Sequence, residues 1–218
     1  MRTDPFSDGV AFLLGATPDH ISIGWGSIPF VAFSTALIGG SIVLAAVNWS
    51  ADPAQRTTRN VAIWLMRGLI GAMWLEGSLW KLPLPVSGGF TYWLGLMGEN
   101  AAFAGYGALI KSLLVPNIAL VNPLIWLTET ALATALLLGV AVRLASLLGI
   151  AMALNLWIGL YHFQAEWPWI YLFIAMLHIF FILDRAGRAL GLDALWLRNP
   201  PGAIGRNPIL ARLQALVS

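Results

Sequence analysis

The sequence predicts an all-α integral membrane protein with five transmembrane helices and additional helices lying in the membrane interface. Hydrophobic residues make up 59% of the 218 positions and charged residues only 10%, whereas about 25% charged is ordinary for a soluble domain. The apolar runs are long, rich in Leu, Ala, Ile and Gly, and lack the alternation of a membrane β-barrel. Helices are the other way to satisfy the backbone inside lipid, so we expect a helical bundle.

The composition excludes several function classes. Because the chain has no cysteine, it cannot use disulfides, thiolate metal sites, iron–sulfur ligation or thiol redox chemistry. The net charge of +2 is too small and too scattered to suggest nucleic acid as a partner. The sequence shows no phosphate-binding loop, no His/Cys cluster at metal-ligand spacing and no Ser/His/Asp arrangement, so we predict no metal site.

The first part of the chain contains two predicted spans. Residues 1–26 are polar, and without a basic n-region they do not resemble a signal peptide. The run 28–47 is about long enough to cross a bilayer, and the polar link NWSADPAQRTTRN separates it from a second span at about 61–80. This second span holds Arg67 and Glu76, whose nine-residue separation places them on opposite faces of one helix. Each therefore needs a partner from another helix or from water.

The rest of the chain predicts an interfacial segment, three more spans and a polar tail. Residues 84–118 are too polar and too Gly-rich to span, and their apolar residues recur at three- and four-residue spacing, as in one or two interfacial helices. Spans follow at about 123–141, 144–162 and 167–184, and the short links between them make neighbouring helices antiparallel. The chain then turns polar and basic, and residues 208–217, PILARLQALV, are predicted to form a short interfacial helix.

The basic residues predict the orientation of the bundle. With five spans, Arg56, Arg59, Arg143 and the basic tail all fall on one side of the membrane, and the link between the last two spans has no Lys or Arg. Lys81 and Lys111 lie on the other side and oppose this assignment only mildly. We therefore expect the amino terminus outside and the carboxyl terminus in the cytoplasm.

Most ionisable groups of the spans are expected in the outer half of the bundle. At about 1.5 Å rise per residue, that half receives Glu76, Lys81, Glu129, Asn155, His162 and Glu166. Asn155 and His162, seven residues apart, are expected on one face of their helix. Glu129 lies inside an apolar run, where an ionisable group is costly and is by default a functional-site hypothesis.

A quinone headgroup suits such a cluster. It has two carbonyls that need hydrogen bonds and, on reduction, two protons, which a carboxylate and an imidazole at the lipid–water boundary can supply. We therefore predict as catalytic candidates Glu129, Glu76, His162 and Lys81, and as ligand-binding candidates Asn155, Arg67 and Trp126. Quinone is expected as a substrate.

Each of these assignments has a structural alternative. Glu129 is equally well explained by a polar bond between helices, to Asn155 or to backbone. Lys81 is slightly better explained as a snorkelling side chain near a helix end. Arg67 lies deeper and is expected to pair with a carboxylate of another helix, with inner-leaflet phosphate or with a partner subunit, and snorkelling inward explains it equally well.

The histidines do not predict a bridged haem. His162 is expected at the outer end of the fourth span and His178 about eleven residues into the fifth, roughly 15 Å apart along the membrane normal. One iron cannot join two ligands at that separation. Ligation of a haem or pigment by a single histidine stays open but is disfavoured.

Three stretches carry a family resemblance: RGLIGAMWLEGSLWKLP (67–83), VPNIALVNPLIWLTETALATALLLGVAVRLASLLGIAMALN (115–155) and DRAGRALGLDALW (184–196). With their spacing they resemble the DoxX/DoxD family of small four-helix membrane proteins. The resemblance implies a four-helix bundle working beside redox proteins, and the DoxD branch is a subunit of thiosulfate:quinone oxidoreductase, which passes thiosulfate electrons to quinone. The positions that match family-like sites are Lys81, Glu129, Arg143 and Asn155.

The resemblance also divides the chain. Residues 1–60 add a transmembrane helix, residues 61–197 form the DoxX-like four-helix domain, and residues 198–218 form a basic cytoplasmic tail. We expect a membrane subunit of a quinone-linked redox enzyme in a prokaryotic plasma membrane, with another redox subunit as partner. The alternative is a non-catalytic integral subunit that anchors or assembles a larger membrane complex. A transporter is less favoured, because the number of spans is odd and no inverted repeat is visible.

Overall fold

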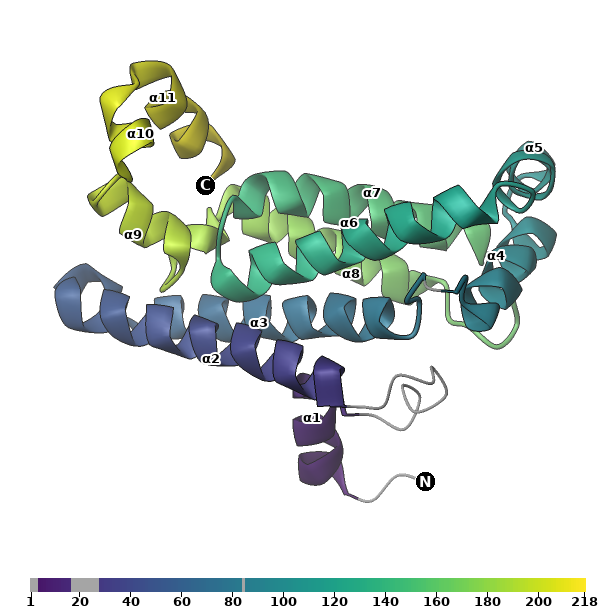
Figure 1. The fold of residues 1–218 in the computed structure, drawn as a ribbon, viewed down its shortest axis with the longest axis horizontal. Coiled ribbons are helices and arrows are strands. Elements are labelled where there is room, and N and C mark those ends of the chain that lie inside the picture. The colour runs from purple at the N-terminus through teal and green to yellow at the C-terminus, as the bar shows by residue number, and fades with distance from the viewer. Residues whose placement is uncertain (1–3, 17–27, 84) are drawn as a thin grey trace.

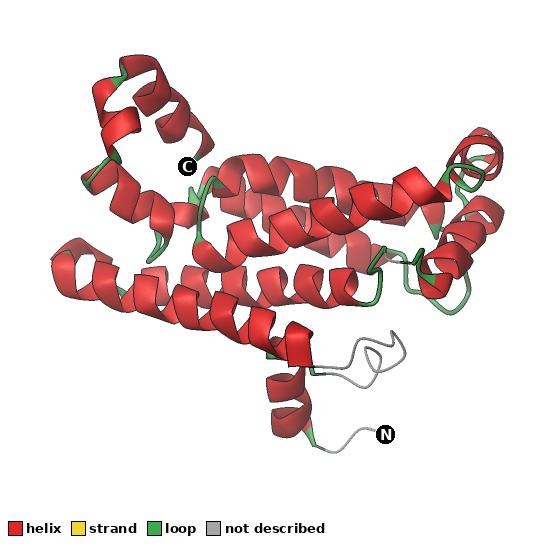
Figure 2. Cartoon of the chain, viewed as in Figure 1, coloured by secondary structure: helices red, strands yellow, loops and turns green. Residues whose placement is uncertain are grey.

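The structure is a computed structural model that describes residues 4–16, 28–83 and 85–218, and every regular element in these ranges is helical (Figure 2). Five long helices form the body of the molecule: α2 (Ile28–Ala51), α3 (Thr58–Leu79), α6 (Ile118–Leu138), α7 (Val142–Gly159) and α8 (Trp169–Leu183). The shorter elements are α1 (Pro5–Leu13), η2 (Pro53–Gln55), α4 (Gly88–Asn100), α5 (Ala104–Leu109), the π-turn η3 (Ile110–Leu114), η4 (Ala186–Arg188), α9 (Leu192–Arg198), α10 (Gly202–Arg206) and α11 (Pro208–Val217). The prediction of an all-α chain is confirmed at this level.

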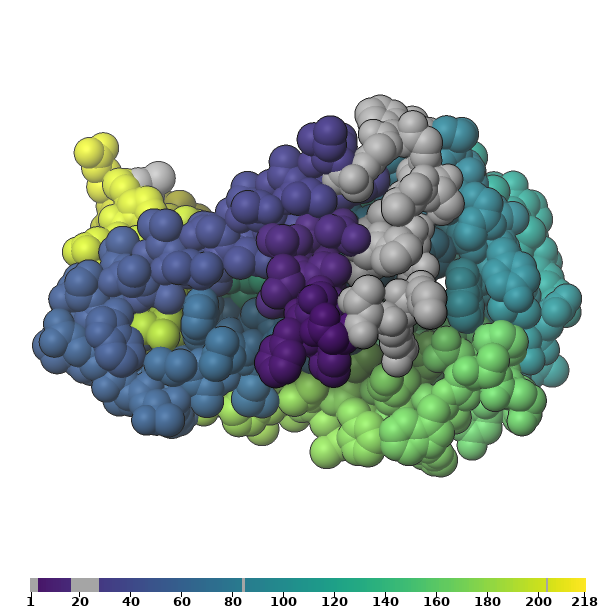
Figure 3. Space-filling view, turned by 90° about the horizontal axis from the view of Figure 1, so that it is seen from below, coloured from purple at the N-terminus to yellow at the C-terminus, as the bar shows by residue number. Residues whose placement is uncertain are grey.

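The five long helices lie side by side along the long axis of the molecule (Figure 1). α3 packs along α6, and α7 packs along α8. α4 and α5 close one end of this bundle, whereas α9, α10 and α11 lie at the opposite end (Figure 1). α1 packs against α3 on the face seen in Figure 3. The predicted polar segment 1–26 lies partly outside the described residues.

Three of the long helices, α2, α6 and α7, are long and apolar enough to cross a membrane. α3 includes Arg59, Arg67 and Glu76, and α8 has 15 residues, about 22 Å of helix against a hydrocarbon core of about 30 Å. Association with a membrane follows from the three apolar helices. The prediction of five spans stays a prediction.

One predicted helix boundary is wrong in a way that affects the site. α7 ends at Gly159 and not near His162, because the following turn is bound to the α4–α5 link. The His162 amide donates to the Asn100 carbonyl at 2.9 Å, and the Ala102 amide donates to the Ile158 carbonyl at 2.8 Å. His162 is therefore exposed beyond the helix, and its expected position on one helical face with Asn155 is incorrect.

The buried guanidinium of Arg67 organises the end of the bundle opposite α4. Only 1% of Arg67 is exposed, and its Nη1 donates to the carbonyls of Ala186 at 2.6 Å and Ala189 at 3.1 Å. Gly139 lies on the face of the guanidinium, since a Cβ at Gly139 would stand 2.7 Å from Cζ and from both terminal nitrogens. Gly139 also ends α6 in the left-handed region, at φ +70°, where glycine is favoured.

Asp193 completes this end of the molecule by capping α7. Its carboxylate accepts from the amides of Ala141 at 2.8 Å and Val142 at 3.3 Å, and its own amide donates to the Gly139 carbonyl at 2.8 Å. Burial raises the pKa of Asp193, and the two amide hydrogen bonds and the nearby Arg67 oppose that shift. The turn from α8 to α9 is thus bound to both α3 and the α6–α7 link.

His178 also has a packing role in the described structure. Its Nε2 accepts from the Trp74 indole N–H at 3.0 Å, and the residue is fully buried. Gly149 of α7 lies against the imidazole, because a Cβ there would approach its Cε1 to 2.3 Å. This close approach lets α7 and α8 pack tightly, as small residues do between membrane helices.

We predict that Gly139→Ala destabilises the protein. A non-glycine residue in the left-handed region costs about 1–3 kcal/mol, and the added methyl must also displace the Arg67 guanidinium. The thermal unfolding midpoint of the purified protein in detergent should fall. The matched control is Gly68→Ala on α3, where an added Cβ meets nothing within 4 Å and the helix gains propensity. Equal midpoints for the two variants would contradict the prediction.

Candidate functional site

A cavity of about 260 Å³ lies at the end of the bundle that α4 and α5 close. Its wall is mostly apolar and comes from α4, α5, α6, α7, α8 and the residues that follow α3. Ligand pockets commonly combine apolar walls with a few polar groups, at volumes from about 300 Å³ upward. At about 260 Å³ this cavity is slightly smaller than that range and suits a single ring.

The Lys81–Glu129 ion pair forms part of the cavity wall. Lys81 Nζ lies 2.5 Å from Oε1 and 2.7 Å from Oε2 of Glu129, so one ammonium contacts both carboxylate oxygens. Only 9% of Lys81 and 2% of Glu129 is exposed. The ammonium also lies over the Trp80 ring, 4.7 Å from its centroid, in a cation–π contact. Gly77 borders the pair, and a Cβ there would lie 3.9 Å from each charged group, at ordinary van der Waals contact.

The backbone around Lys81 is held by α6. Asn122, one of the fully buried residues of α6, donates from Nδ2 to the Lys81 carbonyl at 2.6 Å, and its Oδ1 accepts from the Ser87 amide at 3.0 Å. The Ser87 hydroxyl donates to the Trp80 carbonyl at 2.8 Å. Asn122 and Glu129 are seven residues apart and thus share a face of α6. One helix therefore positions both the backbone and the ammonium of Lys81.

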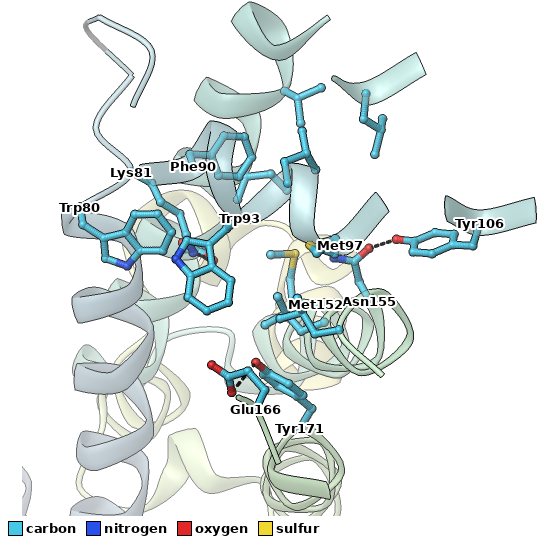
Figure 4. Close-up of a pocket in the computed structure, with 17 residues that line it drawn as sticks. Trp80, Lys81, Phe90, Trp93, Met97, Tyr106, Met152, Asn155, Glu166 and Tyr171 are labelled. Atoms are coloured by element: carbon cyan, nitrogen blue, oxygen red, sulfur yellow. Dashed lines mark hydrogen bonds and ion pairs between the residues drawn. The ribbon is translucent and has the colours of Figure 1, made fainter. Parts of the chain in front are cut away.

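Two further polar pairs line the cavity from other sides (Figure 4). The Tyr106 hydroxyl of α5 donates to Asn155 Oδ1 of α7. The Tyr171 hydroxyl of α8 donates to Glu166 Oε2 at 3.3 Å. Burial raises the pKa of the Tyr106 phenol, so it stays protonated and can donate near neutral pH.

The centre of the cavity is aromatic and sulfur-rich. Trp80 and Trp93 lie on one side, and Met97 and Met152 lie between them and the Asn155–Tyr106 pair (Figure 4). Flat aromatic faces and polarisable thioethers pack well against a ring. The cavity can therefore hold a flat, polar-edged molecule whose edge groups reach the three polar pairs.

The structure brings together some of the predicted site residues. Lys81, Glu129 and Asn155 line the same cavity. Lys81 is a partner of Glu129, so its expected snorkelling to water is incorrect. The structural alternative that paired Glu129 with Asn155 is also incorrect, because Asn155 bonds Tyr106.

The other predicted residues do not line this cavity. Glu76 is half-buried on α3, Trp126 is half-buried on α6, and His162 is exposed with its ring against Tyr161. Arg67 lies fourteen residues before Lys81, about 21 Å away along the axis of α3. It donates to backbone carbonyls at the end of the bundle opposite the cavity.

Several residues that line the cavity were not predicted from the sequence. The notable ones are Tyr106 and Tyr171, because nothing in their local pattern separates an interfacial tyrosine from one that reaches inward. Trp80 and Trp93 lie at the ends of apolar runs, a position that favours an aromatic belt at the membrane interface over a ligand site. The sequence signal that could have indicated these residues is the amphipathic segment 84–118. Its apolar face has to cover some apolar surface of the bundle.

Within the described residues, no group of three or more His, Asp or Glu side chains could hold a metal ion. No known protein family, curated protein or solved structure matches the chain. The resemblance to the DoxX/DoxD family therefore stays a prediction.

We predict a strong coupling between Lys81 and Glu129 in stability. Removing one partner of a buried pair leaves an uncompensated charge and costs about 3–5 kcal/mol, whereas replacing both by apolar residues is often close to neutral. Lys81→Met or Glu129→Leu alone should lower the unfolding midpoint, and the double variant should recover most of the loss. Lys111→Met, which removes an exposed lysine at the same end, should change it little. Additive losses in the double variant would show that the two groups do not depend on each other.

Proposed function

We propose that this chain is a five-span membrane subunit of a quinone-linked redox enzyme, of the thiosulfate:quinone oxidoreductase type, and that the cavity binds the quinone ring. The observation that carries the proposal is the buried Lys81–Glu129 pair in the wall of a mostly apolar cavity. That cavity lies at one end of the helical bundle, where the interfacial helices α4 and α5 cover it. A quinone entering from the lipid would reach it at the lipid–water boundary.

The polar groups of the cavity match the needs of a quinone carbonyl. An ammonium has three N–H donors, and a carboxylate accepts through two oxygens. The Glu129 oxygens occupy at most two of the Lys81 protons, so a third donor remains for a ligand oxygen. Tyr106 and Tyr171 provide hydroxyl groups on the other sides. Trp80 and Trp93 offer flat faces for the ring.

Reduction of a quinone to a quinol takes up two electrons and two protons. In our proposal Glu129 carries protons between the aqueous surface and the ring oxygen, and Lys81 stabilises the negative charge that develops on that oxygen. The electrons come from a partner protein that oxidises thiosulfate. The sequence resemblance to the DoxX/DoxD family supports this choice of donor, and α2 is then an addition to the family's four-helix core.

The orientation follows from the charges of the two ends. Of the described cations, Lys81 and Lys111 lie toward the cavity end, and the arginines lie toward the α9–α11 end. By the positive-inside rule the cavity faces outside and the carboxyl terminus faces the cytoplasm. Thiosulfate would then be oxidised on the outer side, by a partner docked near α4 and α5.

Binding of quinone by the purified chain tests the proposal directly. The intact protein in detergent is titrated with a short-tailed quinone, and quenching of tryptophan fluorescence is recorded. We expect saturable quenching, a loss of affinity of tenfold or more in the Lys81→Met/Glu129→Leu double variant, and smaller quenching in Trp80→Phe/Trp93→Phe. Tenfold corresponds to about 1.4 kcal/mol, roughly one good hydrogen bond to a charged group.

Two controls separate loss of binding from loss of fold. Lys111→Met and Trp64→Phe keep the cavity intact, since Trp64 lies between α2 and α3 and bonds Ser41, and they should bind as the unchanged protein does. Unaltered affinity in the double variant would refute the proposed site. If no quinone binds and the chain instead co-purifies with cofactor-bearing subunits, the non-catalytic anchoring role is favoured.

A further inference from the structure

The carboxyl-terminal tail concentrates positive charge at the end of the bundle opposite the cavity. Residues 194–218 contain no Asp or Glu and carry three arginines: Arg198, Arg206 and Arg212. The acidic groups at this end are fewer and already engaged: Asp52 caps η2, Asp184 pairs with Arg59, and buried Asp193 caps α7. This end of the molecule therefore has an excess of cationic side chains.

α11 is bound to the bundle by its own carbonyl groups. Arg143 Nη1 donates to the Leu216 carbonyl at 2.8 Å, and Arg188 Nη2 donates to the Ala215 carbonyl at 3.0 Å. Both cations lie at the carboxyl end of the helix, where its dipole is negative. Gln214 is buried. α11 is therefore held in one rotational setting relative to the bundle.

This setting leaves an apolar face of α11 uncovered. Ile209, Leu213 and Leu216 are 66%, 50% and 62% exposed, and at 100° per residue they fall within a sector of about 60°. Arg212 borders this sector, 40° from Leu216 on the same helical count. A helix with an apolar face flanked by cations is typical of one that lies in a membrane interface.

We propose that α11 and the arginines around it bind the anionic phospholipid headgroups of the membrane that the bundle spans. Ile209, Leu213 and Leu216 enter the boundary between headgroups and acyl chains, and Arg206 and Arg212 contact lipid phosphates. Charge complementarity selects this occupant, because the excess of arginines at this end favours a dense anionic surface. The inference stands apart from the quinone site, since it uses no residue of the cavity.

The crowding of cations supports the same conclusion. Burial, and then the like charges of Arg185 and Arg143, lower the pKa of Arg188, with Asp193 opposing. An anionic surface beside these groups relieves their mutual repulsion. Each basic residue near such a surface contributes about fivefold in binding, from roughly 1 kcal/mol.

The absence of native cysteine allows a direct test by spin labelling. Single cysteines are introduced into the full chain as Leu213→Cys and, on the opposite face of α11, Ala211→Cys. The labelled proteins are placed in nanodiscs of phosphatidylcholine alone or mixed with phosphatidylglycerol. With phosphatidylglycerol, we expect the label at position 213 to gain accessibility to oxygen and lose accessibility to a water-soluble nickel chelate. The label at position 211 lies on the half-buried face with Gln214 and Ser218, which packs toward the bundle, so its two accessibilities should change little with phosphatidylglycerol.

The charge requirement is tested in the same assay. Arg206→Gln/Arg212→Gln, combined with the position-213 label, should raise severalfold the phosphatidylglycerol content needed to protect the label. Lys111→Gln, at the other end of the bundle, should leave that content unchanged. The inference is overturned if protection is equal without anionic lipid, if positions 211 and 213 behave alike, or if removing the two arginines has no effect.

Discussion

The bundle has to neutralise two cations of one chain segment, and much of its packing serves that need. Arg67 lies within α3 and Lys81 just beyond its end, and both are buried. Lys81 is compensated by Glu129 of α6, whereas Arg67 is compensated by carbonyl groups of the α8–α9 turn and by the nearby Asp193. A buried charge without such partners costs several kcal/mol. The two cations thus bind α3 to α6 at one end and to the carboxyl-terminal turn at the other.

The two ends of the bundle differ in whether there is space for a ligand beside the buried cation. Around Arg67, the approach of Gly139 and the contact of Gly191 leave no space for a ligand, because a Cβ on either would collide with the guanidinium. Around Lys81, the ammonium borders a cavity of about 260 Å³. Arg67 therefore serves the architecture, and Lys81 is available for binding. The two buried cations differ because Gly139 and Gly191 pack directly against Arg67, whereas Lys81 borders a cavity.

Much of the fold, but less of the site, followed from sequence. The apolar runs predicted the five long helices, because length and hydrophobicity are local properties. The end of α7 did not follow, since it depends on hydrogen bonds with Asn100, which accepts from His162, and with Ala102, which donates to Ile158, both far away in the chain. The partnership of Lys81 with Glu129 required knowing that α3 packs along α6. Tyr106 reaches Asn155 only because α5 lies over the end of the bundle, which no helical periodicity reveals.

Stability alone does not explain why an ion pair occupies the position of Lys81 and Glu129. Replacing a buried pair by well-packed apolar residues often costs no stability and can add about 1–4 kcal/mol, and the surrounding cavity wall is already mostly apolar. The rest of the core at this end is built from such residues, including Phe90, Leu94 and Leu160. Asn122 and Ser87 add a further hydrogen-bonded support that holds the lysine backbone in place. Under the proposed function, this costly group at the wall of a cavity serves a ligand that needs a hydrogen-bond donor and a proton carrier there.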